Sequence, residues 1–128
     1  MPYVRIETRG DWIKPMATAL FDNIDAAITR VLKVPPHDSM MRLICHEPAL
    51  MRLPKTADAH FVFIEVALFP GRSANVKSLL YSELTSAVTQ LGIAESQVTI
   101  ALQEIDLHDW GIGGRPASEL QFAFPIKI

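Results

Sequence analysis

The sequence predicts an α/β (α+β) fold built as a tandem β-α-β repeat. Strand-like and helix-like segments alternate as strand, helix, strand, and the same order returns after an insertion. Residues 3–7 align with residues 61–65, and residues 34–38 align with residues 93–97 at almost the same offset. The 128 residues fit one domain. We expect halves of about 1–47 and 60–106 to share a four-stranded mixed sheet with both helices on one face, followed by a C-terminal loop and strand over 107–128.

The first half is predicted to run strand, helix, strand. Residues 3–8 are rich in β-branched and aromatic side chains, as is typical of a strand. A helix is expected to follow through about Lys33, because apolar side chains recur at three- and four-residue spacing. These side chains are Met16, Leu20, Ile24, Ala27, Ile28 and Val31. The prolines within residues 34–38 end the helix, since the residue before a proline avoids the helical region, and residues 40–45 form the second strand.

The second half is predicted to repeat this order after an insertion over residues 46–60. Residues 61–68 are apolar at nearly every position, so we expect a central strand that is covered on both faces. Ser73 is a suitable N-cap for the second helix, and Gly92 is a suitable stop. The remaining elements are predicted to be a strand over 98–105, an irregular loop over 106–116 and a short final strand over 120–124.

Placing both helices on one face leaves the other face of the sheet uncovered. We expect that face to be apolar and to be covered by other subunits, with residues 120–124 helping to pair them. Glu65 interrupts the apolar strand 61–68. A cross-strand pair or an interface partner is therefore predicted for its carboxylate.

Composition narrows the classes of function. The formal net charge of −2 gives no broad basic surface for nucleic acid or an anionic membrane. Cys45 is the only cysteine, and a lone thiol fits a reducing compartment. No signal-peptide pattern and no membrane-length apolar run is seen, so we expect a cytoplasmic protein. The four histidines are scattered without metal-ligand spacing, and we expect neither a metal nor a cofactor.

Pro2 is the first candidate for chemistry. Removal of Met1 would turn Pro2 into an N-terminal secondary amine, and α-amino groups titrate at roughly 7.7–8.0. Such an amine can act as a general base or a general acid near neutral pH. Many chains carry proline at position two without a chemical role, so the argument for catalysis depends on the rest of the chain.

Four motifs stand out along the chain: Pro2, Val34-Pro35-Pro36-His37-Asp38, Gly71-Arg72-Ser73 with Lys77, and Asp109-Trp110-Gly111-Ile112-Gly113. In this order and spacing, they give nearly the whole chain a resemblance to the tautomerase superfamily, and within it to the malonate semialdehyde decarboxylase group. Two positions depart from the decarboxylase pattern. Pro70 stands where the first of two turn arginines is expected, and Ile112 replaces a phenylalanine.

The resemblance implies a tautomerase/MIF-like fold, a homotrimer, and a cofactor-independent enzyme that acts on a small keto or enol carboxylate. The implied reactions are tautomerisation and, beyond it, decarboxylation, hydration or dehalogenation. Pro2, Asp38 and Arg72 are the implied catalytic residues. Arg72 would also bind the substrate carboxylate, while Trp110 and Ile112 would form an apolar wall that excludes water.

Each of these residues also has a structural interpretation. Asp38 is a favoured turn residue after Pro36, Arg72 could be a solvated arginine ahead of a helix, and Trp110 could pack in the core or between subunits. If strands 3–8 and 61–68 lie side by side and antiparallel, as the resemblance implies, the start of one lies near the end of the other. Pro2 would then lie near the turn that contains Arg72.

Two other functions fit the same pattern. One is a non-catalytic trimeric binding protein of this fold, and the other is a dimeric, ferredoxin-like, cofactor-free oxygenase that shares the strand-helix-strand repeat. The native mass separates a trimer from a dimer. Turnover of phenylpyruvate or 2-hydroxymuconate would argue against the binding protein.

Overall fold

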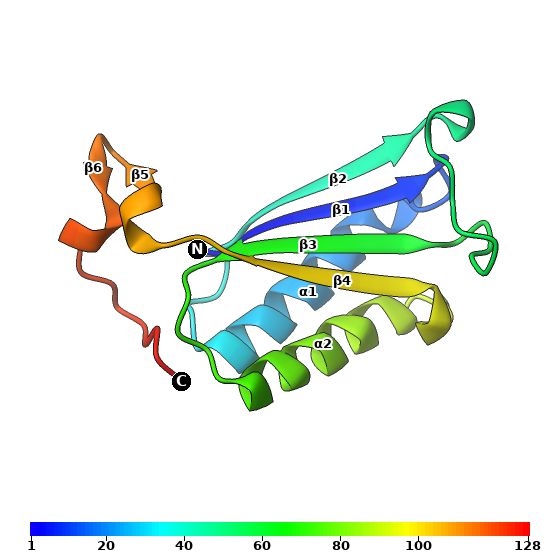
Figure 1. The fold of residues 1–128 in the computed structure, drawn as a ribbon. Coiled ribbons are helices and arrows are strands. Elements are labelled where there is room, and N and C mark those ends of the chain that lie inside the picture. Colours follow the sequence, from blue (N-terminus) through cyan, green and yellow to red (C-terminus); the bar gives the residue numbers. More distant parts are fainter.

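A four-stranded mixed sheet forms the centre of the computed structural model, which describes residues 1–128. The strands are β1 (Tyr3–Arg9), β2 (Met40–His46), β3 (Val62–Leu68) and β4 (Val98–Glu104), in the order β2-β1-β3-β4. Pairing is parallel within each half, β1 with β2 and β3 with β4, and antiparallel where β1 meets β3 (Figure 1). The predicted repeat and the central, antiparallel placement of its two first strands are confirmed.

Two helices of equal length cover one face of the sheet (Figure 1). The first, α1 (Ala17–Leu32), ends at Lys33 in a left-handed conformation, just before the proline pair. The second, α2 (Ala74–Thr89), begins after Ser73, whose hydroxyl accepts the Val76 N–H at 3.2 Å as a helix cap does. Neither helix is long and apolar enough to span a membrane.

The core lies between the helices and the sheet. Alternate residues of the central strands point toward the helices and are fully buried, including Val4 and Ile6 of β1 and Ile64 and Val66 of β3. This alternation follows from the two-residue period of a strand. Burying each such aliphatic side chain contributes roughly 1.5–3 kcal/mol, so the core fixes which face of each strand is turned outward.

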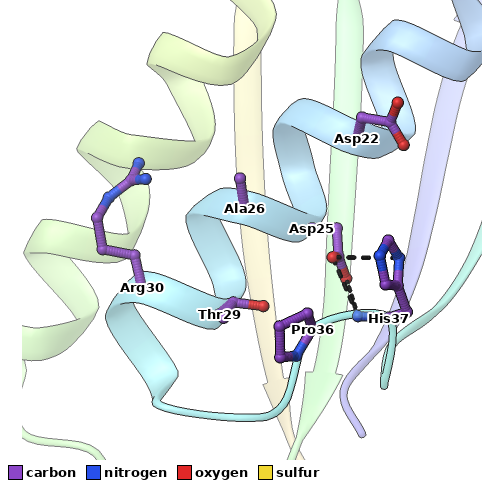
Figure 2. A pocket seen from close by; sticks show the side chains of 7 residues that line it. All are labelled: Asp22, Asp25, Ala26, Thr29, Arg30, Pro36 and His37. Atoms are coloured by element: carbon purple, nitrogen blue, oxygen red, sulfur yellow. Dashed lines mark hydrogen bonds and ion pairs between the residues drawn. The ribbon is translucent and has the colours of Figure 1, made fainter.

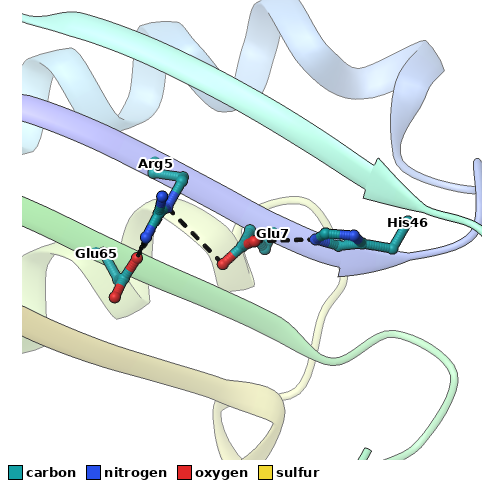
Figure 3. A network of polar contacts seen from close by, with 4 residues as sticks. All are labelled: Arg5, Glu7, His46 and Glu65. Carbon is teal, nitrogen blue, oxygen red and sulfur yellow. Dashed lines mark hydrogen bonds and ion pairs between the residues drawn. The ribbon is translucent and has the colours of Figure 1, made fainter. Parts of the chain in front are cut away.

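The outward face of the sheet differs from the expected apolar surface. Arg5 lies directly opposite Glu65 in the β1–β3 register, and its guanidinium donates to that carboxylate. The Glu7 carboxylate lies 3.9 Å from Arg5 and 2.9 Å from Nε2 of His46, so four side chains from three strands form one network (Figure 3). The cross-strand partner predicted for Glu65 is therefore confirmed. The apolar face is corrected to one of mixed polarity, on which β3 is only partly covered.

The C-terminal segment also differs from the prediction, because residues 120–124 form no strand. After β4 the chain forms a small hairpin of β5 (Gly111–Ile112) and β6 (Arg115–Pro116), followed by a 3-10 turn and an extended tail. The hairpin directs the tail across the end of the sheet where the N-terminus lies, away from the strand edges (Figure 1). There Phe122 packs against Phe69 with ring centroids 5.0 Å apart, so side-chain packing replaces strand pairing.

Short 3-10 segments occupy most of the remaining connections. They cover Lys14–Met16, Pro48–Leu50, Glu95–Gln97, Leu107–Asp109 and Ala117–Glu119. The insertion between β2 and β3 lies at the far end of the sheet from the N-terminus (Figure 1). It is held by Gln97, a buried residue that accepts the Asp58 N–H at 2.6 Å.

Candidate active site

Pro2 lies at one end of the sheet, immediately before β1, and is buried. Its carbonyl accepts the Met40 N–H at 3.3 Å, which ties it to the start of β2. On its other side the antiparallel register pairs Tyr3 with Ala67, so extending that register places Pro2 opposite Leu68. The backbone at Pro2 is therefore held between the two neighbouring strands, and its nitrogen points out of the end of the sheet toward Met1.

Asp38 is placed beside the N-terminus by the connection between α1 and β2. Its carboxylate accepts a hydrogen bond from the Met1 α-amino group, and its backbone carbonyl accepts a second at 3.2 Å. The side chain is 40% exposed and therefore accessible to a small molecule. In sequence Asp38 is far from Met1, and only the parallel pairing of β1 with β2 brings the two together.

A cavity of about 250 Å³ opens at this point. Met1, Asp38 and Ile112 line it, together with Pro35 and residues 121–124 of the C-terminal tail. Met1 also packs against a small apolar cluster that contains Phe69 and Trp110. The methionine thus lies between the Asp38 carboxylate and an apolar wall, directly next to the Pro2 ring.

Arg72 lies in the turn between β3 and α2 and is only 6% exposed. Its guanidinium donates to the Phe69 carbonyl at 2.9 Å, while its buried Nε has no hydrogen-bond partner within the chain. Burial lowers the pKa of Arg72, and the nearby Glu104 carboxylate partly offsets that shift. A buried guanidinium with unused donors is costly, and a carboxylate is the ligand that its planar fork matches.

Trp110 connects these parts of the site. Its indole N–H donates to the Ile105 carbonyl at 3.0 Å, and its ring meets Tyr3 and Phe69 edge-on, each at 5.3 Å. Phe69 in turn supplies the carbonyl that holds Arg72. Trp110 is 8% exposed and does not line the cavity at Met1, whereas Ile112 does.

The structure therefore brings Asp38 and Ile112 to one cavity, which Met1 separates from Pro2. Arg72 and Trp110 do not line that cavity, and both contact Phe69. Two other cations are engaged elsewhere. Lys77 donates to the Glu104 carboxylate, and the exposed Arg115 lies 3.6 Å from Glu119.

Sequence reasoning missed the contribution of the C-terminal tail to the cavity. Gln121 and Phe122 line it, and Ile128 anchors the tail by donating its N–H to the Gly71 carbonyl at 3.3 Å. Gly71 has φ of 130°, and a Cβ there would lie 2.9 Å from the Ile126 carbonyl oxygen. A glycine is needed at this position for both reasons. The sequence signal for this contact is the glycine in the turn before the second helix. That signal does not identify the C-terminal tail as the segment that packs against the glycine.

Comparison with known proteins identifies the family. The family described as "Tautomerase enzyme" matches residues 38–113, more than half of the chain. The chain belongs to the tautomerase family. A probable tautomerase from Ralstonia nicotianae is 38% identical over 56 residues, which are 43% of this chain and 80% of that protein. The resemblance expected from the four motifs is thereby confirmed, and it argues against the ferredoxin-like alternative.

Solved structures of other tautomerase-fold proteins extend the likeness to nearly the whole chain. FG41 malonate semialdehyde decarboxylase, inhibited by 3-bromopropiolate, superposes with a TM-score of 0.81 at 27% identity, covering 96% of this chain and 99% of that one. A second malonate semialdehyde decarboxylase gives a TM-score of 0.79 at 26% identity, covering 89% and 93%. Native fused 4-OT gives 0.83 at 18% identity, covering 92% and 98%, and shares the fold. This tautomerase-family chain is thus an enzyme of the tautomerase superfamily, similar to malonate semialdehyde decarboxylase.

Proposed function

We propose that this tautomerase-family enzyme uses the amine of Pro2, freed by removal of Met1, as a general base and acid on a small keto or enol carboxylate. The observation that carries the proposal is the position of Met1, whose amino group contacts the Asp38 carboxylate inside a cavity with an apolar wall. Removing this one residue would expose the Pro2 nitrogen in the same cavity and would leave room there for a substrate. No cofactor is required for the proton transfers that follow.

The proposed reaction is a tautomerisation in two steps. The neutral Pro2 amine removes a proton from the carbon next to the substrate carbonyl, and the electron pair of that C–H bond becomes part of an enolate. The protonated amine then returns a proton to the enolate, at its oxygen or at another carbon of the same substrate, so the amine is regenerated and no atoms are lost. An α-amino group suits both steps because its ordinary pKa, roughly 7.7–8.0, lies close to neutral pH.

Arg72 and Asp38 are proposed to serve opposite ends of the substrate. The guanidinium of Arg72, whose Nε has no hydrogen-bond partner within the chain, would bind the substrate carboxylate and stabilise negative charge on the enolate. Asp38 contacts the amino group of Met1, so the Pro2 amine would lie one residue, about 3.8 Å between Cα atoms, farther from it. That spacing would let the carboxylate of Asp38 hold a water molecule or a substrate hydroxyl, as well as favour the protonated amine.

Decarboxylation is the second reaction that we propose to test. The two similar decarboxylases, at 27% and 26% identity, support it. In this step the bond to the carboxylate carbon breaks, carbon dioxide leaves, and the protonated Pro2 amine supplies a proton to the remaining enolate. Pro70 stands where a further arginine is expected from the likeness to that group, so we expect decarboxylation to be the weaker activity.

We further propose that the enzyme is a homotrimer whose cavities lie near subunit boundaries. The support is the uncovered sheet face, which carries the partly exposed Tyr3 and Met40 beside the charged network of Figure 3. Fused 4-OT, which shares the fold, has been solved as a symmetric trimer. A sheet that is covered on one face only commonly gains its second cover by assembly.

The test is a substrate panel on wild type and Pro2→Ala, with intact-mass spectrometry of both proteins. Phenylpyruvate and 2-hydroxymuconate test tautomerisation, and malonate semialdehyde tests decarboxylation. We expect the purified wild type to lack one methionine and Pro2→Ala to lose most turnover, keeping only what its primary amine supports. Active protein that retains Met1, or a Pro2→Ala variant as active as wild type, would contradict the proposed mechanism.

A further inference from the structure

A buried carboxylate supports the connection that carries Asp38. Asp25 lies on α1, is only 8% exposed, and faces the chain segment that follows the helix. Both of its carboxylate oxygens lie within hydrogen-bond distance of the His37 N–H, at 3.2 and 3.1 Å (Figure 2). Asp25 belongs to none of the contacts described for the cavity at Met1, so its burial needs a separate explanation.

The residue that Asp25 holds has an uncommon backbone conformation. His37 has φ of 61°, which lies in the left-handed region that side chains with a Cβ rarely adopt. Such a conformation persists where surrounding contacts enforce it. The contact from Asp25 goes to the backbone N–H, while the His37 imidazole lies 3.7 Å away and is 85% exposed. The structure is therefore built to hold the backbone at position 37 more than the ring.

The conformation at His37 decides where the next residue points. The turn is closed by the Asp38 N–H, which donates to the Pro35 carbonyl at 3.3 Å. Beyond it, β2 begins at Met40, whose N–H is bonded to Pro2. Between these fixed points, the left-handed residue at 37 leads into Asp38, whose carboxylate accepts a hydrogen bond from the N-terminal amino group.

We propose that Asp25 is a positioning residue for the reaction at Pro2: its buried carboxylate holds the left-handed turn at His37 and thereby aims the Asp38 carboxylate at the N-terminal amine. The inference rests on the proposed function for the role of Asp38 in turnover. The part that concerns the turn itself depends only on the contacts within the chain. Asp25 touches no substrate in this scheme and acts only through Asp38.

A double-mutant cycle tests the proposal in the full-length enzyme. Asp25→Leu removes the acceptor while keeping a side chain of similar size, and Asp38→Asn removes the charge that Asp25 is proposed to aim. We expect Asp25→Leu to lower kcat about ten- to a hundredfold with little change in KM, the range set by losing a hydrogen bond to a charged group. In the Asp38→Asn background, Asp25→Leu should lower kcat almost no further. Both substitutions remove the same function, which is the Asp38 charge held at the N-terminal amine.

Two controls separate positioning from general damage. Asp22→Leu removes a carboxylate from the same helix that is exposed and lies beside the same surface hollow (Figure 2). It should keep kcat within about twofold, because surface substitutions have small effects. His37→Asn removes the imidazole but keeps the N–H and tolerates the left-handed region, so it should also stay near wild type. Asp25→Asn keeps one acceptor oxygen and should restore part of the loss.

Amide hydrogen exchange gives a readout that does not need activity. The His37 amide should exchange at least about tenfold faster in Asp25→Leu than in wild type, whereas Asp22→Leu should leave it unchanged. If Pro2→Ala retains full turnover but the exchange changes as expected, the proposed function fails and the turn-holding role stands. Fully additive losses in the double-mutant cycle, a loss in His37→Asn as large as in Asp25→Leu, or unchanged exchange at His37 would each overturn the proposal.

Discussion

Removing the Arg72 guanidinium should weaken the enzyme on carboxylate substrates far more than on neutral ones. Arg72 is 6% exposed, and its one side-chain hydrogen bond within the chain goes to the Phe69 carbonyl. A substrate carboxylate bound there would be largely shielded from water. Truncating one partner of such a buried charged pair costs roughly 2–5 kcal/mol, and each ~1.4 kcal/mol is a tenfold change. We therefore expect Arg72→Ala to lower kcat/KM by more than about tenfold.

The assay compares phenylpyruvate with its methyl ester, which lacks the negative charge. Arg72→Ala should reduce kcat/KM on the acid by the amount above and on the ester only slightly. The kcat/KM of Arg72→Lys on the acid should lie between those of wild type and Arg72→Ala. An ammonium group keeps the charge but cannot form the planar, two-pronged contact. Circular dichroism of each variant checks that the fold is kept, because truncating a large buried side chain leaves a cavity that can destabilise the fold.

Arg115 provides a control arginine outside the candidate site. It is an exposed arginine that pairs with Glu119 four residues later, and such surface pairs contribute little. Arg115→Ala should leave kcat/KM within about twofold of wild type on both substrates. An unchanged kcat/KM for Arg72→Ala on every carboxylate that wild type accepts would refute the assignment of Arg72 as the anion site, and a loss in Arg115→Ala would move that site to Arg115.

Three further outcomes follow from the structure. Native mass spectrometry at micromolar concentration should give three times the subunit mass, whereas a monomer would contradict the proposed covering of the open sheet face. Thr8→Val should lower the free energy of unfolding by about 1–3 kcal/mol in urea titrations at fixed protein concentration, because the buried Thr8 hydroxyl bonds both the Phe61 carbonyl and the Trp12 indole N–H. Burial raises the pKa of the Cys45 thiol, with Lys14 opposing the shift, so less thiolate forms at a given pH. Iodoacetamide should therefore alkylate Cys45 more slowly in the folded than in the urea-unfolded chain and need a more alkaline pH, and equal rates would contradict the shift.

The secondary structure was largely readable because its signals are local. The stripe that includes Leu20, Ile24 and Ile28 marks α1, and the apolar run around Ile64 marks a strand, whatever the rest of the chain does. Ser73 caps α2 with its own side chain, so the start of that helix was also predictable. The internal repeat then fixed the order of the elements, and the four motifs indicated the family that the comparisons confirmed.

The tertiary structure decided what those local signals leave open. The segment 120–124 has the composition of a strand, but strand formation needs a free neighbouring edge, and the hairpin at 111–116 leads the chain to the end of the sheet instead. The outward face of the sheet carries a charged pair because Arg5 and Glu65 meet across two strands that are distant in sequence.

The candidate site shows the same division. The residue types of Pro2, Asp38 and Arg72 were visible in the sequence, and their chemistry follows from the side chains alone. Their separations depend on the pairing of β1 with both β2 and β3, which no local pattern fixes. The role proposed for Asp25 could not be foreseen, because a carboxylate on an amphipathic helix is ordinarily solvated. Only the fold turns it inward to meet the backbone at His37.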